Sequence, residues 1–157
     1  MSAAVATAPV AAGAQLQLIS VEVVGQSWGI PIDAVREVLG PQPLTRIPLA
    51  PAAVAGSLNL RGRIVTVLDL RATLGLGPTV APEQATEIVI EQDGELYSLM
   101  IDGVGDALTF PINAMEPPPQ TMDSRWRGLT DGIVKLDGHL LLVLSLDRLL
   151  AAVATAA

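Results

Sequence analysis

The stretch GSLNLRGRIVTVLDLR, residues 56–71, indicates the fold of this chain more clearly than any other. Its pattern predicts a strand, a two-residue turn at Arg61-Gly62 and a second strand. Glycine adopts positive φ without steric cost, so Gly62 suits the tip of a hairpin. The outgoing strand has apolar residues at both odd and even positions, which predicts burial on both faces. Arg61 and Arg63 make the tip cationic, and for an arbitrary sequence this would be an ordinary solvated turn.

The composition indicates a globular domain with an aliphatic core. The chain has 157 residues, a mean hydropathy of +0.50, 3% aromatic residues, no cysteine and a net charge of −7. The negative charge and the lack of a basic run argue against nucleic-acid binding, and the absence of cysteine excludes disulfides and thiolate metal sites. Neither a signal peptide nor a membrane-spanning segment is evident, so we expect a cytoplasmic protein without membrane insertion.

The remaining elements are predicted from hydrophobic spacing and turn signals. Strands are expected over 16–24, 28–30, 87–91, 96–102 and 107–110. Asp93-Gly94 and Asp137-Gly138 predict hairpin turns. The spacing of Ile32, Val35 and Leu39 predicts a helix over 31–39. Short helical segments are expected over 71–76 and from Asp147. The Ala-rich ends, 1–14 and 151–157, are expected to be tails, the first of them disordered.

The two halves of the chain resemble each other. Residues 28–39 align with the second half at a shift of 69, and residues 56–74 align at a shift of 76, so that apolar positions and hairpin glycines coincide. Chance similarity between hairpins is the alternative to duplication. We interpret the pattern as two small barrels, approximately 15–77 and 85–150, with a boundary at 78–84.

The halves differ in charge at two aligned positions. Glu37 and Arg61 have opposite charges, whereas the equivalent Asp106 and Asp137 are both acidic. If the segment containing Glu37 lies beside the hairpin tip, only the first half can form an ion pair there. An exposed ion pair contributes little to stability, so we interpret this pair as holding a contact surface in register.

Residues suited to catalysis are few. His139 is the only histidine and lies at a hairpin tip, where a structural role is expected. Asp102 and Asp106 suggest paired carboxylates, but without further ligands nearby they are expected to be solvated ends of a strand and a turn. No catalytic set is predicted, and a binding module fits better. A small-ligand-binding β-barrel or a hydrolase using these aspartates stays open as an alternative.

Several motifs resemble the CheW family of bacterial chemotaxis coupling proteins. They are TRIP at 45–48, LNLRG at 58–62, LDLR at 68–71, IDGV at 101–104 and PPP at 117–119. The resemblance covers roughly residues 16–150. It implies a mainly β fold with two SH3-like five-stranded antiparallel barrels and short helices, no enzymatic activity and no cofactor. It also implies that the protein bridges the regulatory domain of the histidine kinase CheA and the cytoplasmic tips of chemoreceptors. The same domain ends the kinase itself, so a stand-alone competitor of that regulatory domain is a further alternative.

The resemblance also implies which residues bind partners. The receptor contact would involve Val35, Glu37, Asn59 and Arg61, with Gly62 at the same tip. Arg46 and Ile47 would lie near the kinase contact. Two positions depart from the family pattern: Leu49 stands where the family often has asparagine, and Ser57 stands where it often has valine. Both flank the contact region, so we expect them to influence the choice of partner.

Overall fold

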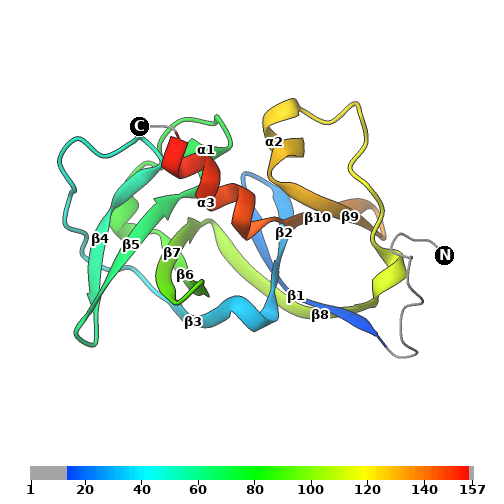
Figure 1. Ribbon diagram of the computed structural model, residues 1–157, viewed down its shortest axis with the longest axis horizontal. Coiled ribbons are helices and arrows are strands. Elements are labelled where there is room, and N and C mark those ends of the chain that lie inside the picture. The colour runs from blue at the N-terminus through cyan, green and yellow to red at the C-terminus, as the bar shows by residue number, and fades with distance from the viewer. Residues whose placement is uncertain (1–13, 156–157) are drawn as a thin grey trace.

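The computed structural model of the protein describes residues 14–155, which form two five-stranded sheets (Figure 1). The first sheet contains, in spatial order, β8 (Gly103–Pro111), β1 (Gln15–Val23), β2 (Gln26–Pro31), β10 (His139–Leu144) and β9 (Thr130–Leu136). The second contains β3 (Val35–Leu39), β6 (Thr86–Gln92), β7 (Glu95–Ile101), β5 (Arg63–Asp69) and β4 (Val54–Leu60). The prediction of a mainly β protein with two five-stranded units is confirmed.

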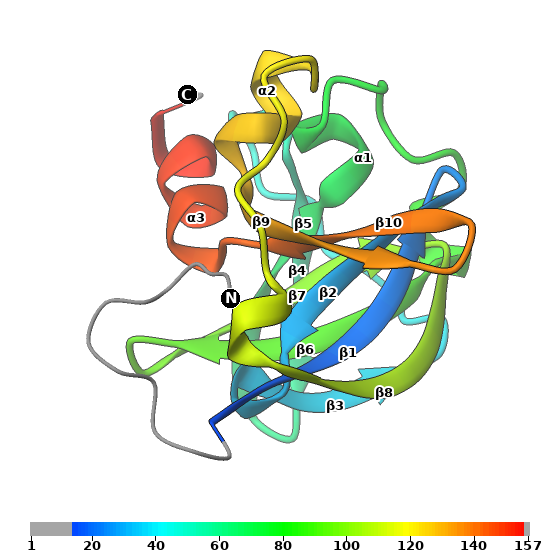
Figure 2. The ribbon, with the colours of Figure 1, turned by 90° about the vertical axis from the view of Figure 1, so that its right-hand side faces the viewer.

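Short helices connect the strands. The α-helices are α1 (Leu70–Thr73), α2 (Ser124–Gly128) and α3 (Leu146–Thr155). The 3-10 turns are η1 (Ile32–Ala34), η2 (Pro82–Gln84) and η3 (Ile112–Ala114). In both ribbon views the three α-helices gather on the upper side of the molecule, and β3 lies on the lower side (Figures 1 and 2).

The boundary predicted at 78–84 does not separate the two sheets, and the division into 15–77 and 85–150 is wrong. Each sheet takes two strands from one half of the chain and three from the other. Four pairs join strands from different halves: β2 with β10 and β5 with β7 are parallel, whereas β1 with β8 and β3 with β6 are antiparallel. Parallel strands cannot be joined by a tight hairpin, so each of the parallel pairs joins strands that are distant in the sequence.

The internal repeat extends to the register of the strands. Trp28 is opposite Leu142 in the first sheet, and the residues aligned with them, Tyr97 and Thr66, are opposite each other in the second. Gly56 and the aligned Gly132 each lie under a crossing carbonyl, so that a Cβ there would meet the oxygen of Thr45 at 2.6 Å or of Glu116 at 2.8 Å. The two sheets are therefore the same unit built twice with exchanged strands, as duplication predicts.

Two other predictions need correction. The helix expected over 31–39 is present only as η1, and Val35–Leu39 is strand β3. The tail expected at 151–157 is helical as far as Thr155, as part of α3. The disordered tail expected at 1–14 lies outside the described residues except for Ala14.

The prediction that both faces of the outgoing strand, β5, are buried is correct only at the C-terminal end of this strand. Val67 and Leu68 are buried, whereas Ile64, nearer the tip, is 69% exposed. The alternating pattern of a half-buried strand therefore applies near the tip, where no second layer covers the sheet.

Each sheet encloses a small core, and a larger shared core joins them. Leu18, Val134, Leu141 and Val143 are buried together in the first sheet. The aligned Leu58, Val65 and Val67 are buried together in the second, with Met100. The shared core contains residues from both sheets, among them Trp28, Leu68, Ile88, Leu99 and Leu142.

The position aligned with Leu18 is a glutamate. Glu87 is fully buried; its Oε1 accepts a hydrogen bond from Ser98 Oγ at 2.6 Å, and Oε2 has no hydrogen-bond partner among the described residues. Burial raises the pKa of Glu87 above its ordinary value, because desolvation disfavours the charged form. The charged carboxylate therefore costs stability at neutral pH.

We expect Glu87→Gln to stabilise the protein at neutral pH, by about 1 kcal/mol. Between the ordinary carboxyl pKa and the raised folded value, the folded state holds more protons than the unfolded state. The contribution of Glu87 to stability is therefore most favourable below its ordinary pKa and falls as pH rises through the raised pKa. Urea denaturation at several pH values measures this, with the exposed Glu95→Gln as control. A variant whose advantage is the same at low and neutral pH would contradict the assignment.

Candidate functional site

The tip of the β4–β5 hairpin is a tight two-residue turn. Arg61 and Gly62 have φ values of 51° and 90°, and Leu60 is opposite Arg63. The Gly62 N–H donates a hydrogen bond to Asn59 Oδ1 at 2.8 Å. Positive φ at both central residues matches the right-handed twist of the strands, and glycine accepts it without strain. The side chain of Asn59 thus shapes the tip.

Arg61 reaches from the tip to Glu37 on β3. Its Nη1 donates to Glu37 Oε2 at 3.4 Å, and its Nη2 donates to Oε1. The hydrogen bond and the negative charge of Glu37 raise the pKa of Arg61 above its ordinary value. Because β3 and β4 are the two edges of the second sheet, the contact joins the ends of the sheet. The predicted pairing of these charges is confirmed.

The ion pair lies at the surface, and exposed aliphatic residues are close to it in the chain. The side chains of Arg61 and Glu37 are 71% and 30% exposed. Val35, at the start of β3, is half-buried against the shared core. Val38, which follows Glu37 in the chain, and Ile64, two residues after Gly62, are exposed. Neither was among the predicted contacts; the alternation of Val35–Leu39 would have revealed Val38, if this segment had been recognised as a strand.

Arg46 and Ile47 belong to a separate surface. They line a groove of about 570 Å³ between the β3–β4 loop and the loop before η2, together with Val54 and Asp69. Val54 lies opposite Leu68, at the end of the hairpin away from its tip. The predicted partner-binding residues therefore form two groups, one at each end of β4 and β5 (Figure 1).

Asp69 fixes one wall of this groove. Its carboxylate is buried and accepts hydrogen bonds from Thr79 N and Thr79 Oγ1, both at 2.7 Å, and from Ala72 N at 3.3 Å. It thereby caps α1 and holds the loop before η2 against it. The sequence indicated Asp69 only as part of a family motif. Its contact with Thr79 was not predicted, because a contact between residues ten positions apart leaves no local signal.

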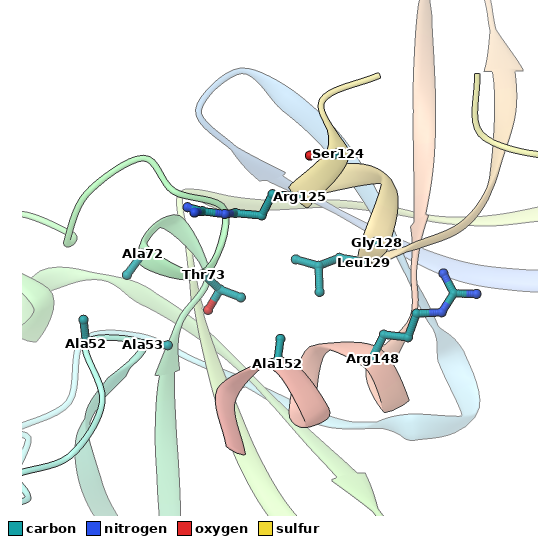
Figure 3. Close-up of a pocket in the computed structure, with 10 residues that line it drawn as sticks. All are labelled: Ala52, Ala53, Ala72, Thr73, Ser124, Arg125, Gly128, Leu129, Arg148 and Ala152. Atoms are coloured by element: carbon teal, nitrogen blue, oxygen red, sulfur yellow. The ribbon is translucent and has the colours of Figure 1, made fainter. Parts of the chain in front are cut away.

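A further cavity, of about 440 Å³, lies among α1, α2 and α3 (Figure 3). Most of its lining is small or apolar: Ala52, Ala53, Ala72, Thr73, Gly128, Leu129 and Ala152. The remaining lining residues are Ser124, Arg125 and Arg148, and the Arg148 guanidinium bonds the Thr130 carbonyl at 3.1 Å and lies 3.6 Å from Asp131. Among the residues that the structure describes, the lining contains no carboxylate and no imidazole, so these residues offer no general acid or base of these kinds.

The aspartates considered as candidate catalytic residues have structural contacts. Asp102 Oδ2 accepts from Val24 N at 2.6 Å and lies 3.9 Å from Arg71 Nη1. The backbone of Asp106 donates to Ser20 Oγ at 2.9 Å. Within residues 14–155, no three carboxylates or imidazoles are gathered as metal ligation requires. Nor does this part of the chain contain a helix long and apolar enough to cross a bilayer.

Comparison with known proteins identifies the family to which this chain belongs. The model of one protein family, described as the CheW-like domain, matches residues 17–154. The chain belongs to the CheW-like domain family. The predicted resemblance is thereby confirmed over nearly the whole chain.

Individual relatives also match this chain over most of its length. A probable chemotaxis protein CheW of Rhizobium etli is 30% identical over 85% of this chain and 86% of its own length. Chemotaxis protein CheW of Rhizobium meliloti is 31% identical over 83% of this chain and 84% of its own length. The crystal structure of the scaffolding protein TtCheW from Thermoanaerobacter tengcongensis superimposes with a TM-score of 0.76 at 28% identity, covering 87% of this chain and 92% of that one.

Proposed function

We propose that this CheW-like protein is a non-catalytic adaptor in chemotaxis that couples chemoreceptors to the histidine kinase CheA. The observation that carries the proposal is that the candidate residues form two separate groups, one at each end of the β4–β5 hairpin. The tip and β3 present Asn59, Arg61, Gly62, Glu37 and Val35 for the cytoplasmic tips of receptors. The groove at the other end presents Arg46 and Ile47 for the regulatory domain of the kinase.

Support comes from the rigidity of the part between these surfaces. The strands that connect them have buried side chains in two cores, at Val65, Val67 and Leu68. A rigid spacer allows two partners to be held at once without steric conflict. Each contact can then be modest while the ternary complex is strong, because the second binding event is intramolecular. The names of the relatives, chemotaxis protein CheW and scaffolding protein, agree with this role.

A capture experiment with three purified components tests the proposal. Immobilised receptor tips should retain the kinase only when this protein is present, and the protein should bind each partner separately. Binding to the kinase without binding to receptors would support the competitor of the regulatory domain instead. Saturable binding of a nucleotide or metal ion, without association to either protein, would support a small-ligand-binding barrel.

A further inference from the structure

Leu49 occupies a turn that does not suit leucine. Ala50 N donates to the Ile47 carbonyl at 3.3 Å, which closes a four-residue turn with Pro48 second and Leu49 third. Leu49 has a φ of 62°. Where a turn needs positive φ at its third residue, glycine or asparagine is preferred, because other side chains are strained there. The turn requires the left-handed conformation, and leucine adopts it at a cost in stability.

The side chain of Leu49 contributes no burial that would offset this strain. It is fully exposed, at 102% of the reference area. Val80, which follows the groove residue Thr79 in the chain, is also 87% exposed. An isolated exposed leucine is common on protein surfaces. An exposed leucine at a strained position is different, since both features favour asparagine or glycine in the isolated protein.

The charge beside Leu49 indicates what would cover it. Arg46 lies in the same groove and is exposed, and no ion pair or hydrogen bond of its side chain is found in residues 14–155. The one acid among the described lining residues of the groove, Asp69, is buried and accepts hydrogen bonds from Thr79 and Ala72. The rim therefore combines a projecting aliphatic side chain with a free cation. The complementary surface is an apolar pocket beside a carboxylate.

We propose that Leu49 is a specificity-determining residue of this adaptor, which inserts into an apolar pocket on the regulatory domain of the histidine kinase, next to a carboxylate that pairs with Arg46. This rests on the proposed function, since it assigns the groove to the kinase. Burial of the leucine in the complex offsets the strain of the turn. Asparagine at this position would suit the turn but could not fill an apolar pocket.

The test compares Leu49→Asn with the wild-type protein in two measurements. We expect the variant to unfold about 2 °C higher, because the turn is relieved of strain. We expect its dissociation constant for the purified kinase regulatory domain, measured by calorimetry, to rise about tenfold. Leu49→Gly should behave in the same way. Arg46→Glu should also weaken kinase binding, but without raising the melting temperature.

The matched control is Val24→Asn. Val24 is another exposed aliphatic residue with positive φ, at 51°, and it lies in the β1–β2 turn. This variant should melt higher than wild type and bind the kinase domain unchanged. Equal kinase affinity of Leu49→Asn and wild type, or no gain in its melting temperature, would overturn the inference while leaving the adaptor proposal intact. Failure of the wild-type protein to bind the kinase would instead overturn the proposed function.

Discussion

Capture of chemoreceptor tips is expected to fall at least about tenfold in the Arg61→Glu variant, while capture of the kinase is unchanged. The change places two carboxylates side by side, because Arg61 now bonds Glu37 through both of its terminal nitrogens. Repulsion should separate the hairpin tip from β3 and alter the surface that both elements form. The groove lined by Arg46 and Ile47, which we propose as the kinase contact, lies at the other end of the hairpin and should not respond.

The matched control is Arg63→Glu, which makes the same charge change two residues away. Arg63 is exposed on the other side of the turn and forms no ion pair within the described residues. Receptor capture by this variant should stay close to that of wild type. Both variants should melt near the wild-type temperature, since Arg61 and Arg63 are both exposed. Equal capture by Arg61→Glu and wild type would remove Arg61 from the receptor site.

Trp126→Ala should cause the largest loss of stability, about 3 kcal/mol of unfolding free energy. Trp126 in α2 packs against the fully buried Trp28, with ring centroids 5.7 Å apart, and its Nε1 donates to the Leu74 carbonyl at 3.1 Å. Helix α2 leads into the first sheet, and Leu74 ends the helix that follows the second sheet. One side chain therefore links the two barrels. Denaturant unfolding followed by circular dichroism measures the effect.

Trp126→Phe separates the two contributions of this residue. Phenylalanine keeps an aromatic ring beside Trp28 but cannot donate to Leu74, so we expect a loss of about 1 kcal/mol. A similar loss for Trp126→Phe and Trp126→Ala would mean that the hydrogen bond dominates. A loss well below 1 kcal/mol for the alanine variant would show that Trp126 does not join the barrels.

The elements predicted well are those whose signal is local. Turns at Arg61-Gly62, Asp93-Gly94 and Asp137-Gly138 were predicted because residues that accept positive φ lie between apolar runs, and all three glycines have positive φ. The internal repeat was also visible, since glycines and apolar positions recur at fixed distances. These features need no knowledge of distant contacts.

The errors arose where distant contacts decide the structure. Val35–Leu39 has apolar residues at a helical spacing, yet it pairs with β6 from the other half of the chain and becomes a strand. The exchange of strands between the halves depends on pairs of strands that are distant in the sequence, and such pairs have no turn signal. The repeat boundary therefore predicted that there are two barrels, but it did not predict which strands belong to each barrel.

The candidate site was predictable to the same degree. Opposite charges at Glu37 and Arg61 were enough to predict a pair, because the repeat showed like charges at the equivalent positions. The groove could not be predicted, since it requires the loop containing Leu49 to lie near the loop held by Asp69 and Thr79. Exposure and positive φ at Leu49 are also properties that only a three-dimensional structure reveals.

The exchanged strands have a consequence for how the molecule responds to force and to proteolysis. Neither barrel can open fully without withdrawing strands from its neighbour, because each sheet is completed by the other half of the chain. A nick in the segment 78–84 would leave two interlocked fragments rather than two free domains. We therefore expect a force applied at one end of the β4–β5 hairpin to be transmitted to the other end.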